Sequence, residues 1–350
     1  MKGRQIILGP LFGRDAAALV QDGQVQDLAF DPGADIPVAP GAICRARVER
    51  LIKGQGGVFV KLPGGASGYL RDRSGLREGQ ALLVQVTGVA EGGKAIPVSS
   101  RLLFRGRHVI VTPGAPGVNV SRRIRDEQLR GWLGGLGQTA LADDGASLGL
   151  IFRSIAAQAD AEDITDELNQ LLEIARAILA DKGQAPELLL DAPTPADIAW
   201  CDWADDQPTD IVEGPQAMED CGIAHQVEQL LTPRTALDGG AWAAVEPVSA
   251  LTAIDVNTGA DHSPAAGLKA NIALARDLPR QLRLRGIGGQ IVIDFAPMPK
   301  RDRGTLEQVL RSAFKREAAE TVLIGWTAMG LYEINRKRDR IPLTRLRTEA

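Results

Sequence analysis

The chain has 350 residues, 44% of them hydrophobic and 24% charged, with a formal net charge of −4. This balance excludes a disordered or fibrous protein, and the length predicts two or more domains. Three widely spaced cysteines and three histidines without HExxH or HxH spacing predict neither a disulfide framework nor a histidine-based metal site.

The N-terminal segment predicts a first strand over residues 6–12, IILGPLF. Arg14 and Asp15 end this apolar run, and no small-residue cleavage site follows, so we do not interpret it as a signal peptide. No apolar run in the chain approaches the roughly 18 residues that a membrane-spanning helix needs. We therefore expect a cytoplasmic protein without a membrane span.

The next segment predicts a small β-barrel. Five short strands are separated by turns rich in glycine or proline, and they cover residues 42–50, 56–62, 66–72, 81–89 and 94–100. Five short strands in about 60 residues are typical of the oligonucleotide-binding barrel.

The barrel segment is also basic. Residues 42–107 hold twelve Lys and Arg against four Asp and Glu, whereas acidic residues concentrate in 158–222. A basic module on an acidic chain indicates a polyanionic partner, although an unevenly charged solvated surface explains the same count equally well.

Two aromatic residues, Phe59 and Tyr69, lie on neighbouring predicted strands. Alternation puts Phe59 on the face opposite Val58 and Val60, so Phe59 faces solvent if the valines fill the core. Aromatic rings beside Lys and Arg are surfaces on which single-stranded nucleic acid stacks. We favour this interpretation over the alternative that both rings belong to the core.

The following part of the chain mixes strands and helices. Strands are predicted at 108–113, 148–156 and 187–192, and helices at 125–135 and 160–182. The longer helix has an apolar stripe and ends at Gly183. A loop rich in Pro, Trp and Asp follows, and we expect its tryptophans to pack rather than bind.

From residue 240 the pattern changes to α/β. Strands are predicted at 249–257, 288–298 and 321–326, helices at 268–285 and 303–319, and a short segment at 331–338. The runs TAIDV and IVIDF are apolar on both faces, which predicts a sheet covered by helices on each side.

Asp255 and Asp294 occupy matching places, since each closes an apolar strand just before the chain turns. Function in α/β sheets collects outside the carboxyl ends of strands. With the amide of Asn257 the two carboxylates form an oxygen-only set that suits Mg²⁺ or Mn²⁺, and the basic run 300–303 could grip a phosphodiester. Capping of the following loops by each Asp explains the residues about as well.

The segments ALTAIDVNTGA (250–260), RQLRLRGIGGQIVIDF (280–295) and GLYEINRKR (330–338) closely resemble the catalytic half of the bacterial ribonuclease E/G family. In that family the aspartates of the IDxN and IDF motifs bind one Mg²⁺, and the Asn of the first motif orients them. The resemblance therefore implies one Mg²⁺ per active site. The matching catalytic residues are Asp255, Asn257 and Asp294, with the two aspartates as metal ligands.

The likeness extends to the N-terminal half. GVFVKLPGGASGYL (57–70) resembles the RNA-binding S1 segment of the family, which implies that Phe59 and Tyr69 stack RNA and that Lys94 is the S1 lysine. FRGRHVI (104–110) and LIFRSIA (150–156) resemble the pocket that senses a 5′-monophosphate. The residues that match this pocket are Gly106, Ile110, Arg153 and Ser154.

The resemblance covers nearly the whole chain and implies an α/β multidomain fold. A ribonuclease-H-like domain is interrupted by an S1 (OB-fold) β-barrel and a 5′-sensor region, and a DNase-I-like α/β catalytic domain follows. The implied boundaries are 1–37 with 200–232 for the split ribonuclease-H-like domain, 38–101 for the barrel, 102–199 for the sensor and 233–350 for the catalytic domain.

The sequence departs from the family pattern at several places. It ends before the family's CPxC zinc-link motif, so a zinc-joined tetramer is not expected, and a homodimer through the DNase-I-like domain is implied by resemblance alone. Ala273 stands where the family has Glu, Pro279 interrupts the predicted helix, and REAAE (316–320) replaces a more basic stretch.

The resemblance implies a Mg²⁺-dependent endoribonuclease that cuts single-stranded RNA by attack of a metal-activated water and prefers 5′-monophosphorylated ends. The changes at Ala273 and 316–320 keep open an alternative, an RNA-binding relative with weak or lost catalysis. A scaffold that uses the acidic surface of residues 158–222 is a third hypothesis, ranked below both.

Overall fold

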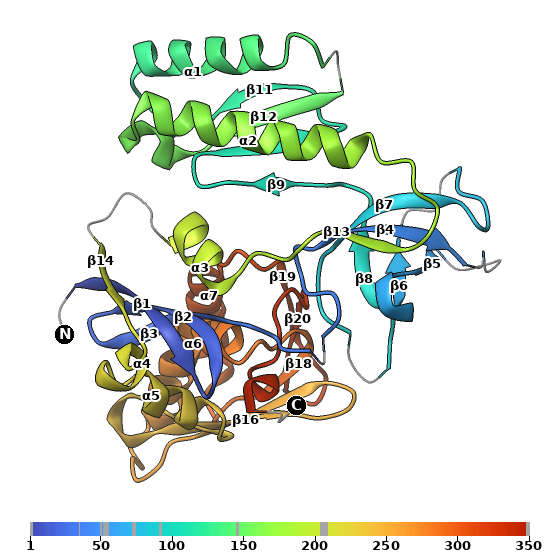
Figure 1. The fold of residues 1–350 in the computed structure, drawn as a ribbon. Helices are drawn as coiled ribbons and strands as arrows, with labels where there is room; N and C mark the ends of the chain where they lie inside the picture. The colour runs from blue at the N-terminus through green and yellow to red at the C-terminus, as the bar shows by residue number, and fades with distance from the viewer. Residues whose placement is uncertain are drawn as a thin grey trace. The chain divides into compact units, whose positions relative to one another are not determined.

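The computed structural model describes residues 3–34, 36–49, 51, 56–71, 75–90, 93–144, 147–203 and 209–347. The chain divides into two compact units. Unit 1 comprises Met1–Ile6 and Gly33–Val212, and unit 2 comprises Ile7–Pro32 and Glu213–Ala350. Figure 1 traces the chain through both units.

The N-terminal strands form a sheet with the order β14-β1-β2-β3, and the division between the units falls within β1 and β14. The predicted first strand is confirmed. The strands are β1 (Arg4–Leu11), β2 (Arg14–Gln21), β3 (Gln24–Phe30) and β14 (Thr209–Glu213). Asp22 and Gly23 both adopt positive φ between β2 and β3, which matches the primed turn that a two-residue hairpin prefers.

The five predicted barrel strands are all present in unit 1. They are β4 (Ile43–Val48), β5 (Val58–Lys61), β6 (Ser67–Leu70), β7 (Ala81–Val86) and β8 (Ile96–Ser99). Their order is β4-β5-β6-β8-β7, and the pairing of β7 with β4 closes the barrel. Alternation fills the interior with small branched side chains such as Val58 and Val60, which are fully buried. A sixth strand, β13 (Glu187–Leu190), pairs with the outer edge of β4.

Unit 1 also contains a layer of two helices on a four-stranded sheet (Figure 1). The strands are β9 (Phe104–Arg105), β10 (Val109–Pro113), β11 (Gly117–Val120) and β12 (Leu148–Phe152). The helices are α1 (Glu127–Ala140) and α2 (Ala161–Leu179). Most of the predicted apolar stripe of α2 is confirmed, because Leu168 and Leu172 are buried against the side chains of this sheet. Ile174, also assigned to the stripe, is exposed.

Three short helices follow. They are α3 (Pro195–Ile198), α4 (Ala217–Asp220) and α5 (Ile223–Leu230). Among the tryptophans of the Pro/Trp/Asp-rich loop, Trp203 is buried, as expected. Trp200 is more than one third exposed, and the guanidinium of Arg107 lies 5.6 Å from its ring centroid.

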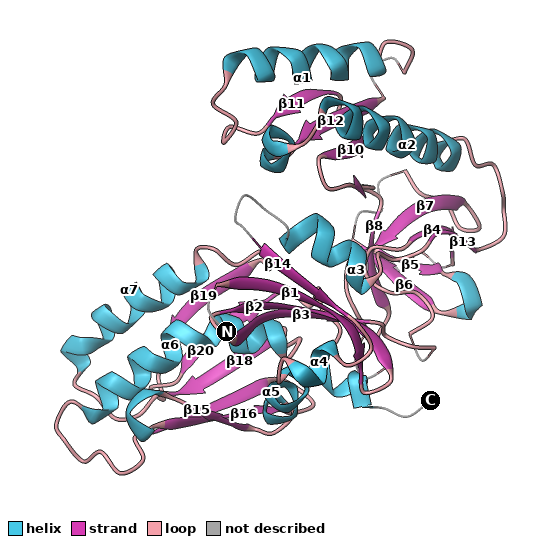
Figure 2. Ribbon diagram, turned by 60° about the vertical axis from the view of Figure 1, so that its left-hand side comes forward, coloured by secondary structure: helices cyan, strands magenta, loops and turns pink. Residues whose placement is uncertain are grey.

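Unit 2 is built on a six-stranded mixed sheet with the order β15-β16-β17-β18-β20-β19. Its strands are β15 (Arg234–Ala236), β16 (Trp242–Pro247), β17 (Thr252–Asn257), β18 (Gly289–Asp294), β19 (Thr321–Trp326) and β20 (Tyr332–Arg336). Helices α6 (Ala266–Leu284) and α7 (Arg303–Phe314) lie along one face of this sheet (Figure 2).

The prediction that this sheet is covered on both faces is wrong. Along β17 and β18 the side chains alternate between the helix-covered core and an open face, so Ile254 and Ile293 are buried whereas Ala253 and both strand-end aspartates are exposed. The apolar residues Ala253 and Val292 on the open face hid this alternation in the sequence. Pro279 does not interrupt the predicted helix either, because α6 continues through it to Leu284.

A chain of ion pairs ties the outer elements of unit 2 together. Asp27 on β3 accepts hydrogen bonds from Arg340, and it lies 3.7 Å from Arg283 of α6. Arg283 and Arg336 both bond to Glu317, whose side chain is only 7% exposed. Buried charges of this kind are stable only as complete sets, because each partner compensates for the lost hydration of the other.

No helix among the described residues is long and apolar enough to cross a membrane.

Replacing Glu317 with alanine should lower the free energy of unfolding by about 3–5 kcal/mol, because Arg336, itself 2% exposed, would keep a buried uncompensated charge. Urea unfolding followed by circular dichroism measures the change. Glu320→Ala removes an exposed carboxylate three residues away and should change stability by less than about 0.5 kcal/mol. Equal effects of the two variants would show that the Glu317 pairs contribute nothing.

Candidate functional site

The two strand-end aspartates face each other across one strand pair. Strands β17 and β18 run parallel, and Asp255 is the cross-strand partner of Asp294. Partner residues on adjacent strands lie about 5 Å apart and point to the same face. Both carboxylates are exposed on the open face of the sheet. The predicted match between the two strand ends is therefore a matter of register as well as of sequence.

The amide of Asn257 belongs to the same group. Its Nδ2 donates a 2.7 Å hydrogen bond to Oδ2 of Asp255. Residues 255 and 257 project from the same face because side chains alternate along a strand. The bond holds the Asp255 carboxylate through one oxygen, and no other side chain in the described part of the chain bonds to it.

The donor set fits a hard cation. No cluster of three or more His, Cys, Asp or Glu ligands occurs among the described residues, so this pair offers two carboxylates and no enclosed cage. Proteins commonly bind Mg²⁺ through one or two carboxylates, while waters and substrate phosphate complete its coordination. Soft or nitrogen ligands, which would favour zinc, take no part in the Asp255, Asn257 and Asp294 group.

A buried asparagine on α6 holds the chain where it leaves β18. Asn271 is fully buried, and its side-chain amide donates to the Ala296 carbonyl and accepts from the Ala296 N–H, both at 2.9 Å. One turn earlier, a Cβ on Gly267 would approach the Pro297 carbonyl oxygen to 2.1 Å, so only glycine allows this contact. These contacts fix the backbone two residues after Asp294.

Sequence reasoning missed this role of Asn271. A polar residue in the apolar stripe of a predicted helix was the available signal. Its partner is a backbone group 25 residues along the chain, which no local pattern identifies.

The positions in unit 2 that depart from the family pattern have defined surroundings. Ala273 is half-buried on α6, two residues from Asn271. Within 316–320, Arg316 is exposed, whereas Glu317 belongs to the ion-pair chain with Arg283 and Arg336. The first glutamate of REAAE, Glu317, is therefore explained by its arginine partners.

The two aromatic residues of the barrel lie on its outer surface. Phe59 is the cross-strand partner of Tyr69, and their ring centroids are 5.4 Å apart in an edge-to-face arrangement. Both rings are half-buried, whereas Val58 and Val60 fill the interior. The prediction that Phe59 points outward is confirmed.

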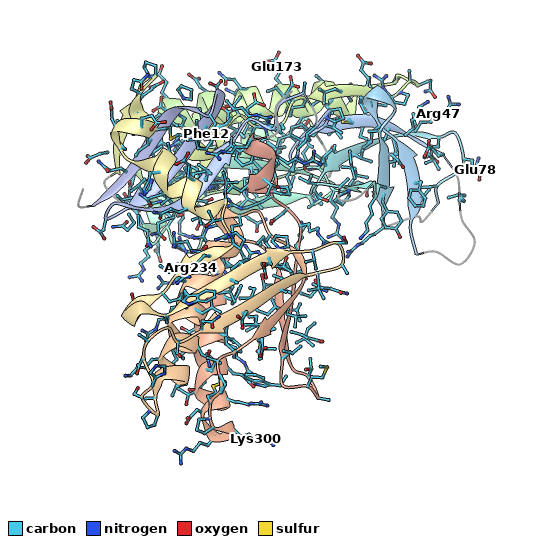
Figure 3. The ribbon with its side chains drawn as sticks, turned by 90° about the horizontal axis from the view of Figure 1, so that it is seen from below. Phe12, Arg47, Glu78, Glu173, Arg234 and Lys300 are labelled. Atoms are coloured by element: carbon cyan, nitrogen blue, oxygen red, sulfur yellow. The ribbon has the colours of Figure 1, made fainter. Side chains whose placement is uncertain are left out.

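Exposed basic side chains lie on the same barrel as the two rings. Lys61 follows Phe59 on the outer face and pairs across the strands with Arg47, which is exposed. Figure 3 labels Arg47 on the barrel. Lys94 is exposed in the turn before β8. Arg50, Lys53 and Arg73 of the basic segment lie outside the described residues.

One arginine of the basic segment has a structural role. The Arg45 side chain is 8% exposed and donates to Asp181 and Glu187, with its shortest contact to Asp181 at 2.7 Å. The hydrogen bond from Arg45 holds the pKa of Asp181 below its usual range. Gly183 leaves the space that the Arg45 guanidinium occupies, since a Cβ there would meet its Cζ at 2.0 Å. Charge counting alone had assigned Arg45 to the basic surface.

The predicted 5′-phosphate residues come together at the edge of the helix-covered sheet in unit 1. Arg153 donates through Nη1 to the Gly106 carbonyl at 2.9 Å. Ile110 is half-buried and pairs with Ile151 of β12, the strand that ends directly before Arg153. Ser154 is half-buried and directly follows Arg153.

Glu167 of α2 organises the backbone beside this group. Its carboxylate accepts from the N–H groups of Arg107, His108 and Val109 and contacts His108 Nδ1 at 3.0 Å. A Cβ on Gly106 would approach Glu167 Oε1 to 2.2 Å, so the close approach of α2 requires glycine.

An unexpected carboxylate lies at the same place. Oδ1 of Asp202 accepts from Arg105 at 2.9 Å and lies 3.5 Å from Nη2 of Arg153. The Asp202 side chain is 35% exposed, so solvent reaches this contact. The acid-rich loop in the sequence was the available signal, but no pattern there connects it with Arg105 or Arg153.

The contacts of Asn271 predict a stability effect close to the aspartates. Asn271→Ala would leave two buried backbone groups of Ala296 without partners, each at a cost of about 1–3 kcal/mol. We expect the free energy of unfolding in urea to fall by at least about 2 kcal/mol. Arg276→Ala on the exposed side of α6 is the control and should change it by less than about 0.5 kcal/mol. A loss below 1 kcal/mol for Asn271→Ala would contradict this account.

Comparison with known proteins identifies the family of this chain. The ribonuclease E/G family profile matches residues 104–217 and 210–339, which together are more than half of the chain. The chain is 25% identical to ribonuclease G of Escherichia coli K12 over 380 aligned residues, covering 92% of this chain and 77% of that protein. It is 30% identical to ribonuclease E of Nostoc over 298 residues, covering 74% of this chain and 43% of that protein. The chain belongs to the ribonuclease E/G family.

Proposed function

We propose that this member of the ribonuclease E/G family, an endoribonuclease of RNA processing, cleaves single-stranded RNA with one Mg²⁺ held by Asp255 and Asp294. The cross-strand pairing of these two aspartates on an open sheet face carries the proposal. Two carboxylates at neighbouring strand ends, with no third such ligand beside them among the described residues, leave room for waters and a phosphate oxygen around the ion. The exposed face lets an RNA strand approach.

The residues of the site have different roles in this proposal. Asp255 and Asp294 provide the negative charge that holds the ion, and the hydrogen bond from Asn257 keeps the Asp255 carboxylate in one orientation. Bound Mg²⁺ supplies an activated water and offsets charge on the phosphoryl group. Asn271 acts as a positioning residue through the backbone that follows Asp294.

The barrel binds the RNA strand in this proposal. Phe59 and Tyr69 present two ring surfaces on which unpaired bases stack, and stacking tolerates any sequence because every base has a π-face. Lys61, Arg47 and Lys94 add positive charge for the phosphates. RNA affinity should fall as salt concentration rises. Binding of the protein releases counterions from the RNA, and this release is less favourable at high salt.

The 5′ end is proposed to bind at Arg153. A guanidinium offers the bidentate fork that phosphate prefers, and Ser154 adds a hydroxyl donor beside it. The carboxylate of Asp202 at Arg105 and Arg153 supports an anion site here, because an oxyanion already bonds to one of these guanidinium groups. The predicted homodimer and cytoplasmic location stay predictions.

The second candidate function is RNA binding with weak or lost catalysis. It is favoured by Ala273, which lacks the carboxylate that the family resemblance implies at this position. Salt-sensitive RNA binding without Mg²⁺-dependent cleavage would select it.

Asp255→Asn and Asp294→Asn should each lower Mg²⁺-dependent cleavage of a 5′-monophosphorylated single-stranded RNA on the order of 100-fold or more, because each removes a charged ligand. Cleavage is followed by gel electrophoresis of end-labelled RNA. Glu246→Gln is the matched control, since it removes a carboxylate from the adjacent strand β16 and should leave the rate unchanged. The assignment fails if the wild type cuts nothing or if the two variants cut as well as it does.

Asp202→Asn should raise the preference for 5′-monophosphorylated over 5′-hydroxylated RNA several-fold. The substitution removes a negative charge that competes with the terminal phosphate, and an exposed pair of this kind is worth up to about 1 kcal/mol. The ratio of cleavage rates on the two RNAs measures it. Arg153→Lys should lower the same ratio because lysine lacks the bidentate fork. An unchanged ratio in both variants would remove the 5′-phosphate site from the proposal.

A further inference from the structure

A stacked pair of side chains, Arg234 and Trp242, lies on the open face of the unit 2 sheet. Arg234 belongs to the edge strand β15 and is exposed, and its Cζ lies 4.3 Å from the centroid of the Trp242 ring. Trp242 begins β16 and is half-buried. Arg234 is labelled in Figure 3, where its side chain can be followed at this sheet.

The register of the sheet puts this pair beside the aspartates. Trp242 is the cross-strand partner of Asn257. One row of partners runs from Arg234 through Ala244 and Asp255 to Asp294. Adjacent strands lie about 4.8 Å apart, so the backbone of Arg234 is roughly 10 Å from that of Asp255. An RNA strand bound at the aspartates would bring a neighbouring nucleotide to Arg234.

Only a small side chain lies between Arg234 and the aspartates on the open face. Ala244 lies between them in the row, and its methyl group is the only side-chain mass that the row contributes there. Trp242 stands one row further along, toward the end of the sheet at which Asn257 lies. On the open face, the stacked Trp242 and Arg234 side chains therefore lie on one side of Ala244, and the two carboxylates lie on the other.

The Arg234 guanidinium is available for a ligand. Within the described ranges its side chain stacks on Trp242 and makes no hydrogen bond or ion pair. Arginines Arg283, Arg285 and Arg336 of the same unit are all hydrogen-bonded. An exposed cation–π contact stabilises a fold by only about 0.5–1 kcal/mol, so stability gives little reason for this pair.

The stack suits one kind of ligand. Arg guanidinium planes and aromatic rings are the surfaces on which unpaired RNA bases stack. One face of the guanidinium rests on the indole, which holds the plane still and leaves its outer face for a base. A guanidinium that is already ordered loses less freedom when the base binds.

We propose that Arg234 and Trp242 form a nucleobase subsite, in which an unpaired base next to the scissile phosphate stacks on the outer face of the Arg234 guanidinium. Trp242 supports this guanidinium from behind. The subsite rests on the proposed function and deepens it, because it binds the substrate within the unit that holds the aspartates and independently of the barrel. It is a substrate contact and takes no part in the chemical step.

The test uses abasic RNA with the chain of residues 1–350. A 5′-monophosphorylated single-stranded RNA with a defined cleavage site is compared with versions that lack one base at each position flanking that site. Wild-type protein should lose on the order of 10-fold in kcat/KM at one flanking position, because base stacking is removed while every phosphate is kept. Arg234→Lys, which keeps the charge and loses the plane, should lose a similar factor on intact RNA and nothing further on the abasic RNA.

Two further variants separate the stack from charge and from folding. Trp242→Leu keeps an apolar side chain and should reduce discrimination against abasic RNA in the same way, with circular dichroism confirming that the protein is folded. Arg311→Lys on α7 is the control arginine and should behave as wild type on every RNA. Binding of the same RNAs to Asp255→Asn protein, measured by fluorescence anisotropy, should show the same base dependence without cleavage.

The outcomes distinguish this subsite from the proposed function. If wild type does not cut with Mg²⁺, the proposed function is wrong, and the subsite is then judged by the base dependence of RNA binding alone. If wild type cuts and Asp255→Asn does not, but Arg234→Lys still discriminates against abasic RNA at the sensitive position as wild type does, the subsite alone is overturned. Absence of any sensitive flanking position in wild type also overturns it.

Discussion

The parallel, in-register pairing of β17 with β18 is the constraint on which the candidate active site depends. It puts Asp255 and Asp294 opposite each other on one face. Side chains alternate along a strand, so a slip of one residue would turn one aspartate into the core formed by Ile254 and Ile293. Two parallel strands also need a crossover connection, which α6 provides. The site therefore depends both on the strand register and on the crossover helix that allows the parallel pairing.

Helix α6 makes stabilising contacts on two of its sides. Toward the six-stranded sheet, Asn271 and Gly267 fix the backbone that follows Asp294. Toward β3, Arg283 donates to the Gln26 carbonyl and pairs with Glu317. The acidic residue at 317 thus compensates buried positive charge at the back of the helix. A departure from the family pattern that suggests a damaged active site has a structural cause in this chain.

Patterns of alternation and strand ends were enough to predict much of this fold. The valines at 58 and 60 identified the barrel interior and put Phe59 outside, because period two is a local property of a strand. Partners far apart in sequence were not predictable, since no periodicity says which carboxylate meets which arginine. Arg45 counted toward a basic surface yet lies buried against Asp181, and Asp202 counted toward an acidic loop yet bonds Arg105.

Net charge is a poor guide to the partner of this protein for the same reason. A charge of −4 would oppose RNA only if the charges acted together, but exposed charges are screened within about 10 Å at 0.1 M salt. Many carboxylates are used locally, as Asp27 and Glu317 are against Arg340 and Arg336. Such pairs cancel and add nothing to the total, so an approaching strand responds to local exposed charges such as Arg47 on the barrel and Arg234 beside the aspartates. The positions of the exposed arginines, rather than the sign of the total, therefore decide where a polyanion can bind.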